Sequence, residues 1–129
     1  MVTIRQMVRD LNMDVEVIGR PTVREADGLA MSSRNVYLSA EDRMAALSLS
    51  QSLSVAQKRC REGKRDAGSI LAEVTRILTR YPGNRIDYAK IVHPQTLKEL
   101  ETINPRGTLA LAVRVGKTRL IDNCVLEVN

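Results

Sequence analysis

Residues 24–38, READGLAMSSRNVYL, bring together side chains that can bind phosphate, in a segment with neither a helical nor a strand period. The adjacent hydroxyls of Ser32 and Ser33 can donate hydrogen bonds to phosphate oxygens. Arg34 adds a permanent charge on a planar donor fork, and Gly28 allows an unusual turn or a close backbone approach. Composition alone leaves two interpretations open: an anion-binding loop, or a polar connection between two domains.

Charged residues around this loop could support it. Arg24 supplies a second cation, and the carboxylates of Glu25 and Asp27 can orient the cations. Near the other end of the chain, Asp122 lies close in sequence to Arg119. We expect an acid and a neighbouring arginine in this arrangement to form a structural ion pair.

Residues 115–118, VGKT, share the Gly-Lys pair of phosphate-binding loops. That motif also needs a glycine five residues before the pair, and the position is occupied by Leu111, inside a predicted strand. Gly116 and Lys117 are therefore predicted to form the turn of a β-hairpin.

The sequence offers few histidine and cysteine side chains for a zinc site. The single histidine, His93, precedes Pro94 and is predicted to be a structural residue at a strand end. Cys60 and Cys124 lie far apart in sequence, do not form a metal-ligand motif, and are expected to be reduced. The sequence therefore predicts no metal site.

The composition is that of a small globular domain. The 129 residues are 43% hydrophobic and 27% charged, which suits one domain with its own core. No apolar run approaches the length of a membrane span, and no signal peptide is visible. We therefore expect a cytoplasmic protein without a membrane partner.

The net charge of +5 favours anionic partners. A small basic nucleic-acid-binding module is therefore an alternative function, and a pure interaction domain is a third. Against nucleic acid, the chain contains no Trp or Phe and only three Tyr, so it offers few platforms for stacking bases. The densest group of basic residues, within 58–65, is predicted to be the solvated end of a helix.

The first elements look like the edge of a larger α/β domain. Residues 3–11 place Ile4, Met7, Val8 and Leu11 on one helical face. Residues 14–19, DVEVIG, then predict a short β-branched strand. One helix and one strand cannot form a doubly wound sheet on their own.

Two helices should follow the loop. Ser39 is predicted to cap a helix that ends near residue 61, and Asp66 to start a second helix that is broken after residue 81. The first has an apolar face of Ala46, Leu49, Leu53, Ala56 and Cys60, and the second one of Ile70, Val74, Ile77, Leu78 and Tyr81.

The rest of the chain is predicted to be mainly strand. Residues 85–92 should place Ile86 and Tyr88 on the same side, and a short helix could occupy residues 95–101. Residues 108–115 alternate strictly, and residues 118–128 continue the sheet. The fold class is therefore α+β: a small, mostly antiparallel sheet packed with helices.

The segment DVEVIGRPTVREADGLAMSSRNVYLS closely resembles the pantothenate synthetase (pantoate–β-alanine ligase) family. The resemblance extends to IRQMVRDL before it and to IDYAKIV, LALAVRVGKTRLIDN and VLEV after it, and it is looser in the two long helices. Within this family, MSSRN corresponds to the KMSKS-type loop of class I nucleotidyl-transferring folds.

The resemblance implies that ATP, with Mg²⁺, and pantoate form pantoyl adenylate, which the amine of β-alanine then attacks. It implies that Val23 meets the adenine-ribose end of ATP through its backbone. It also implies that Met31 packs near the nucleotide and that Ser32, Ser33 and Arg34 hold the phosphates. Asp27, Gly28 and Asn35 would shape the loop.

The resemblance also implies a division of the chain. Residues 1–22 would be the tail of a Rossmann-like nucleotidyl-transferase domain, residues 23–38 the ATP-loop connection, and residues 39–129 a C-terminal lid. The family's HxGH motif, substrate-binding glutamines and Gly-Lys-Lys-Asp segment are absent from the sequence, and His93 does not replace them. We therefore expect the isolated chain to be inactive, with no certain catalytic residue, and to form a homodimer or larger assembly through its unpaired apolar faces.

Overall fold

The computed structural model describes residues 1–128 and contains three α-helices, one short 3₁₀ helix and three strands. In chain order these are α1 (Val2–Asp10), η1 (Ser33–Tyr37), α2 (Ala40–Arg61), α3 (Ala67–Leu78), β1 (Asn84–Val92), β2 (Arg106–Val115) and β3 (Thr118–Glu127). None of the helices in this described part of the chain has the length and apolar character needed to cross a membrane.

The two long helices begin and pack as their sequences predict. Ser39 Oγ accepts a hydrogen bond from the Asp42 amide at 3.1 Å, and the carboxylate of Asp66 accepts one from the Ser69 amide at 2.6 Å. The predicted inner faces of both helices are buried, apart from Tyr81, which lies beyond α3 and is partly buried against the core.

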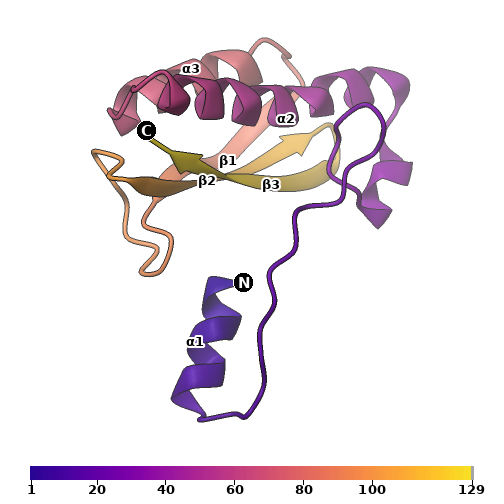
Figure 1. The fold of residues 1–129 in the computed structure, drawn as a ribbon. Helices are drawn as coiled ribbons and strands as arrows, with labels where there is room; N and C mark the ends of the chain where they lie inside the picture. The colour runs from indigo at the N-terminus through magenta and orange to yellow at the C-terminus, as the bar shows by residue number, and fades with distance from the viewer. Residues whose placement is uncertain (129) are drawn as a thin grey trace.

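The strands form one antiparallel sheet in the order β1-β2-β3. On β2 the predicted core face is fully buried, with Leu109, Leu111, Val113 and Val115 all at zero exposure. Both α2 and α3 lie across this face of the sheet, so the core is a single layer between helices and sheet (Figure 1). The β2–β3 hairpin turns at Gly116 and Lys117, as predicted.

A β-bulge corrects the predicted alternation of β1. The pairing of β1 with β2 shifts register between Ile86 and Tyr88, so the two side chains do not share a face as expected. Ile86 packs against the core, whereas Tyr88 is 38% exposed. The extra residue, Asp87, lies on the solvent side and pairs with Arg119 at 2.6 Å.

The helix predicted at residues 95–101 does not form. After β1, the His93 ring nitrogen Nδ1 accepts hydrogen bonds from the amides of Gln95 and Thr96, both at 3.3 Å, which confirms a structural role for this histidine at a strand end. Leu97 then takes a left-handed φ of 59°, which interrupts a helix after one turn. The chain returns to the sheet, where Glu99 bridges to Val92.

The strand predicted at residues 14–19 is also absent from the described structure. Residues 13–23 leave α1 as an extended chain that runs toward the sheet domain without pairing with another strand (Figure 1). A strand needs a hydrogen-bonded neighbour, and residues 1–128 place none beside this segment. Its apolar side chains therefore remain exposed together with those of α1: Ile4, Met7, Leu11, Met13, Val15 and Ile18.

Candidate functional site

Residues 23–31 form a small hairpin that gives the candidate loop its shape. The Glu25 amide donates to the Leu29 carbonyl at 2.8 Å, and the Gly28 amide donates to the Glu25 carbonyl at 2.9 Å. Gly28 has a φ of 92°, the left-handed conformation that closes a three-residue hairpin loop. Two residue pairs further out, beyond the Arg24–Ala30 pair, the Met31 amide donates to the Val23 carbonyl at 2.9 Å.

The base of this hairpin is anchored in the fold. Leu29 is only 4% exposed and belongs to the core between the helices and the sheet. Arg24 donates to both carboxylate oxygens of Asp122 on β3, at 2.7 and 3.0 Å, and to the Gly28 carbonyl at 3.1 Å. The expected pairing of Asp122 with Arg119 is therefore wrong, because Arg24 reaches the inner face of β3, where Asp122 is buried.

A second ion-pair cluster holds the loop to α2. Arg43 pairs with Glu25 and Asp27, both at 2.6 Å. The amide of Asn35, and next Arg43, lower the pKa of Glu25, whereas Arg43 is the main cause of the lowered pKa of Asp27. The prediction that these two carboxylates orient the cations of the loop is therefore wrong, because both pair with Arg43 on α2 and not with Arg24 or Arg34.

Asn35 closes the loop on itself. Its side-chain amide donates to Glu25 at 2.5 Å and to the Ala30 carbonyl at 3.0 Å, and the residue is 8% exposed. A buried asparagine with two donors engaged ties the end of the loop to its beginning. Asp27 contributes from the hairpin turn, where its carboxylate accepts from the Leu29 amide at 3.2 Å.

The tip of the loop, residues 31–34, takes no part in the ion pairs that anchor the rest of the loop. Met31 is 62% exposed, and Ser33 and Arg34 are also exposed. The hydroxyl of Ser32 accepts from the Arg34 amide at 3.2 Å and so starts η1. Within residues 1–128, the Arg34 guanidinium forms no ion pair with an acidic side chain.

A pocket of about 280 Å³ brings this tip together with β3. Met31, Ser32 and Arg34 line it from the loop, and residues 119–123 line it from the strand. These are the segments MSSRN and TRLIDN, which lie far apart in the sequence. Val23 lies at the start of the hairpin with 65% exposure, and neither it nor Ser33 lines the pocket.

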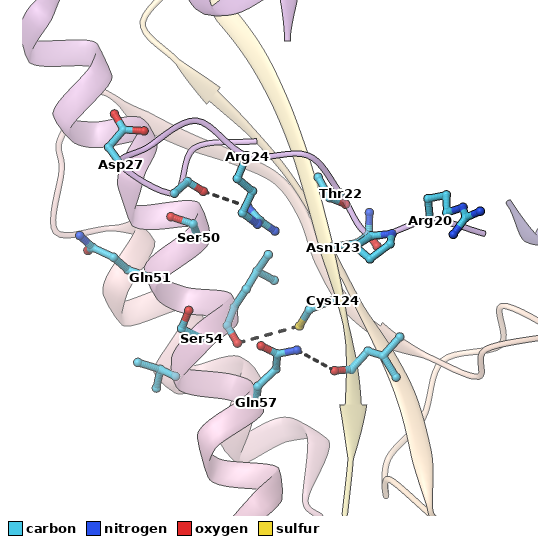
Figure 2. Close-up of a pocket in the computed structure, with 15 residues that line it drawn as sticks. Arg20, Thr22, Arg24, Asp27, Ser50, Gln51, Ser54, Gln57, Asn123 and Cys124 are labelled. Atoms are coloured by element: carbon cyan, nitrogen blue, oxygen red, sulfur yellow. Dashed lines mark hydrogen bonds between the residues drawn. The ribbon is translucent and has the colours of Figure 1, made fainter. Parts of the chain in front are cut away.

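A larger pocket of about 890 Å³, which Arg24 helps to line, was not predicted from the sequence. Its walls come from residues 20–28, from α2 and from β3 (Figure 2). Gln57 reaches across from α2 to donate to the Val125 carbonyl at 3.1 Å, and Cys124 faces the Leu53 carbonyl at 3.9 Å. Burial raises the pKa of the Cys124 thiol to about 12, so this cysteine is a poor nucleophile.

The family model for pantoate–β-alanine ligases matches residues 1–125. This chain belongs to the pantoate–β-alanine ligase family. Among curated relatives, the pantothenate synthetase of Syntrophus aciditrophicus is 54% identical over 125 residues, which cover 97% of this chain and 44% of that protein. The bifunctional pantoate ligase/cytidylate kinase of Thermosynechococcus vestitus is 60% identical over 96% of this chain and 24% of its own length.

Solved structures agree with this assignment to the pantoate–β-alanine ligases. The crystal structure of pantothenate synthetase from Thermus thermophilus has a TM-score of 0.89 and 43% identity, over 95% of this chain and 44% of that one. A pantoate–β-alanine ligase from Francisella tularensis, complexed with β-γ ATP and β-alanine, has a TM-score of 0.56 and 26% identity over 94% and 37%. The chain thus spans less than half the length of these relatives and matches part of the pantothenate synthetase structure.

The resemblance to pantoate–β-alanine ligases implies Mg²⁺, but the acidic residues of this site do not fit a Mg²⁺ site. Across residues 1–128, no group of three or more His, Cys, Asp or Glu side chains could hold a metal ion. The carboxylates of the loop, Glu25 and Asp27, pair with Arg43, and Asp122, which lines the pocket at the loop tip, pairs with Arg24.

The basic residues that suggested nucleic-acid binding form a network at one end of α2 in this pantoate–β-alanine ligase homologue. Arg59 and Lys64 both pair with Glu73 on α3, at 2.9 and 3.0 Å. Lys58 lies 3.8 Å from Glu62 one turn further along. Much of the positive charge is thus balanced locally, and no observation favours nucleic acid as a partner.

Proposed function

We propose that this chain is the ATP-loop and C-terminal lid part of a ligase that condenses pantoate and β-alanine to pantothenate. The observation that carries the proposal is the division of the loop of residues 24–38 into a fixed first half, residues 24–29, and an exposed tip, residues 31–34. Ion pairs and a buried leucine hold the first half, whereas Arg34 at the tip lacks an ionic partner within the described chain. A loop built this way leaves the Arg34 guanidinium available to bind a phosphate group.

The tip residues then take the following roles. Ser32, Ser33 and Arg34 hold the ATP phosphates, and Met31 packs beside the nucleotide. Val23 meets the adenine-ribose end through its backbone, which the exposure of this residue permits. The positive charge of Arg34 stabilises the negative charge that develops on the phosphates as the bond to pyrophosphate breaks.

The reaction proceeds in two steps in this proposal. A carboxylate oxygen of pantoate attacks the α-phosphorus of ATP, which forms pantoyl adenylate and expels pyrophosphate. The β-alanine amine then attacks the acyl carbon, loses a proton and expels AMP. Because residues 1–128 contain no cluster of three or more His, Cys, Asp or Glu side chains that could hold Mg²⁺, the ion would have to be held mainly by the nucleotide and by residues outside this chain.

The three parts of the chain have separate roles in this proposal. Residues 1–22 belong to the nucleotide-binding domain, residues 23–38 connect, and residues 39–129 close over the site as a lid. The exposed apolar side chains of residues 4–18 support the first assignment, because such a face is normally covered by the rest of a domain.

A titration with ATP followed by NMR tests the nucleotide role. We expect chemical-shift changes at the amides of residues 31–34 at millimolar ATP, and we expect Arg34→Gln to weaken binding about tenfold because it removes a charged hydrogen-bond donor. Arg61→Gln at the exposed end of α2 is the matched control and should leave binding unchanged. Shifts confined to other residues would contradict the assignment.

Activity is tested separately by a coupled assay for ATP-dependent pantothenate formation. We expect the 129-residue chain alone to give no product, because the sequence lacks the motifs that hold pantoate and β-alanine in the family. Product formed by this chain alone would overturn the proposal that it supplies only part of the active site.

A further inference from the structure

We infer that Asp122 and Arg24 are positioning residues that hold the proposed ATP loop at the angle at which its tip can meet phosphate. The inference rests on the proposed function of the loop and adds residues that the resemblance did not assign. Arg24 belongs to the loop and Asp122 to β3, 98 residues further along the chain.

The carboxylate of Asp122 is buried and already accepts hydrogen bonds from neighbouring donors. Its side chain is 4% exposed, and it accepts from both terminal nitrogens of Arg24 and from the Asn123 amide, at 2.7, 3.0 and 2.8 Å. Three donors on one buried carboxylate leave it little capacity for another ligand. The paired contact with the guanidinium also fixes direction, because two parallel hydrogen bonds hold the plane of the fork.

Arg24 connects Asp122 to the turn of the hairpin. The nitrogen Nη1 that bonds Asp122 also donates to the Gly28 carbonyl at 3.1 Å, so the guanidinium spans the hairpin from its stem to its turn. Arg43 fixes the same hairpin to α2 through Glu25 and Asp27. The loop is therefore held from two sides, by the strand and by the helix, and the pocket beside its tip has β3 as its other wall.

The two arginines of the loop consequently have different tasks. The charge of Arg24 is neutralised by Asp122 on β3, so Arg24 is not a phosphate ligand. The guanidinium of Arg34, at the exposed tip of the loop, has no ion-pair partner within residues 1–128. The distance between the tip and β3 then depends on the Arg24–Asp122 pair, because this pair joins the loop to the strand that forms the opposite wall of the pocket.

The test compares Asp122→Asn with Glu73→Gln in the 129-residue chain. Glu73 is a matched control, since it is also a carboxylate paired with two cationic groups, Arg59 and Lys64, but it lies on α3, beside the C-terminal end of α2. We expect Asp122→Asn to raise the Kd for ATP about tenfold, and Arg24→Lys to raise it by a smaller factor, because lysine keeps the charge and loses the fork. Glu73→Gln should leave the Kd unchanged.

A second measurement does not depend on ATP. Backbone ¹⁵N relaxation should show increased motion of residues 24–35 in Asp122→Asn, with the helices and sheet unchanged, and no such increase in Glu73→Gln. In Arg24→Lys, the motion of residues 24–35 should lie between that of the wild type and that of Asp122→Asn.

The outcomes separate the two proposals. An unchanged loop in Asp122→Asn would overturn the positioning role, whether or not ATP binds. If the wild type binds ATP, an equal ATP affinity in Asp122→Asn would also overturn it. Loop motion that increases in Asp122→Asn, together with no response of residues 31–34 to ATP in the wild type, would support the tether and refute the nucleotide role.

Discussion

Asn84, the first residue of β1, donates its side-chain amide to Ser48 Oγ on α2 at 3.0 Å and to the Leu78 carbonyl at the end of α3 at 2.9 Å. One buried side chain thus joins the sheet to both helices. Asn84→Ala should destabilise the fold by about 2–4 kcal/mol, because it leaves buried groups without partners. Urea unfolding measures this loss. Ser48→Ala removes one of these contacts and should cost only about 1 kcal/mol; a larger loss than for Asn84→Ala would refute the ranking.

The hairpin turn should not tolerate a side chain at Gly116. This residue has a φ of 55°, and a Cβ there would lie 2.8 Å from the carboxylate oxygens of Asp42. We expect Gly116→Ala to destabilise the domain by about 1–3 kcal/mol. The comparison is Gly83→Ala, where nothing lies within 4 Å of the added carbon. Adding Asp42→Ala to Gly116→Ala should restore part of the lost thermal stability, and no recovery would show that backbone strain alone is responsible.

Low pH should weaken the attachment of the loop to α2. The carboxylates of Glu25 and Asp27, which both pair with Arg43, should respond differently when Arg43 is replaced. The pKa values of Glu25 and Asp27 lie below their ordinary values of 4.5 and 3.8, so their stabilising effect is complete above those values and is lost as the pH falls through the folded-state pKa values. In Arg43→Gln we expect the pKa of Asp27 to return closer to normal than that of Glu25, because Asn35 still holds Glu25. Carbon-13 NMR titration of the carboxyl groups measures both values, and an unchanged Asp27 would refute the assignment.

Neither cysteine should react readily in the folded protein. A pKa of about 12 leaves about one Cys124 thiol in ten thousand ionised at pH 8, and Cys60 is fully buried. We expect slow labelling by a thiol reagent in the native state and rapid labelling of both residues in urea. Rapid native labelling of Cys124 would show that the larger pocket opens.

The 129-residue chain should associate with itself through α1 and the extended segment that follows. Ile4 and Met7 are 51% and 47% exposed on one side of α1, and such an apolar surface favours contact between copies. Sedimentation velocity should show concentration-dependent association that Ile4→Glu with Met7→Glu reduces. Met44→Glu, at an exposed position of α2, is the control. A monomer at all concentrations would count against this expectation.

The sequence predicts best those elements whose partners are close along the chain. Helices α2 and α3 follow from Ser39, Asp66 and a regular apolar stripe, and the β2–β3 hairpin follows from alternation around Gly116. The strand expected at residues 14–19 failed for a different reason, since strand formation depends on a neighbour and not on β-branched residues alone. In β1, the bulge at Asp87 was hidden because a residue on the solvent side gives no apolar signal.

In the candidate site, too, local features could be predicted from the sequence and long-range contacts could not. The phosphate-binding character of Ser32, Ser33 and Arg34 can be read from their side chains. The partners of Arg24 and of Glu25 cannot, since they lie on β3 and α2 and are brought to the loop only by the complete fold. Proximity in sequence even favoured the wrong partner for Asp122.

The long separation between Arg24 and Asp122 has a consequence for how the chain folds. Closing a loop of this size early would carry a large entropic cost, whereas α2, α3 and the sheet can assemble through contacts that are closer along the chain. We therefore expect the Arg24–Asp122 pair to form only after the sheet is in place, whereas Arg43 can bond Glu25 and Asp27 earlier because only 18 and 16 residues separate them. The segment proposed to receive the nucleotide would then be attached in two stages, to α2 first and to β3 last.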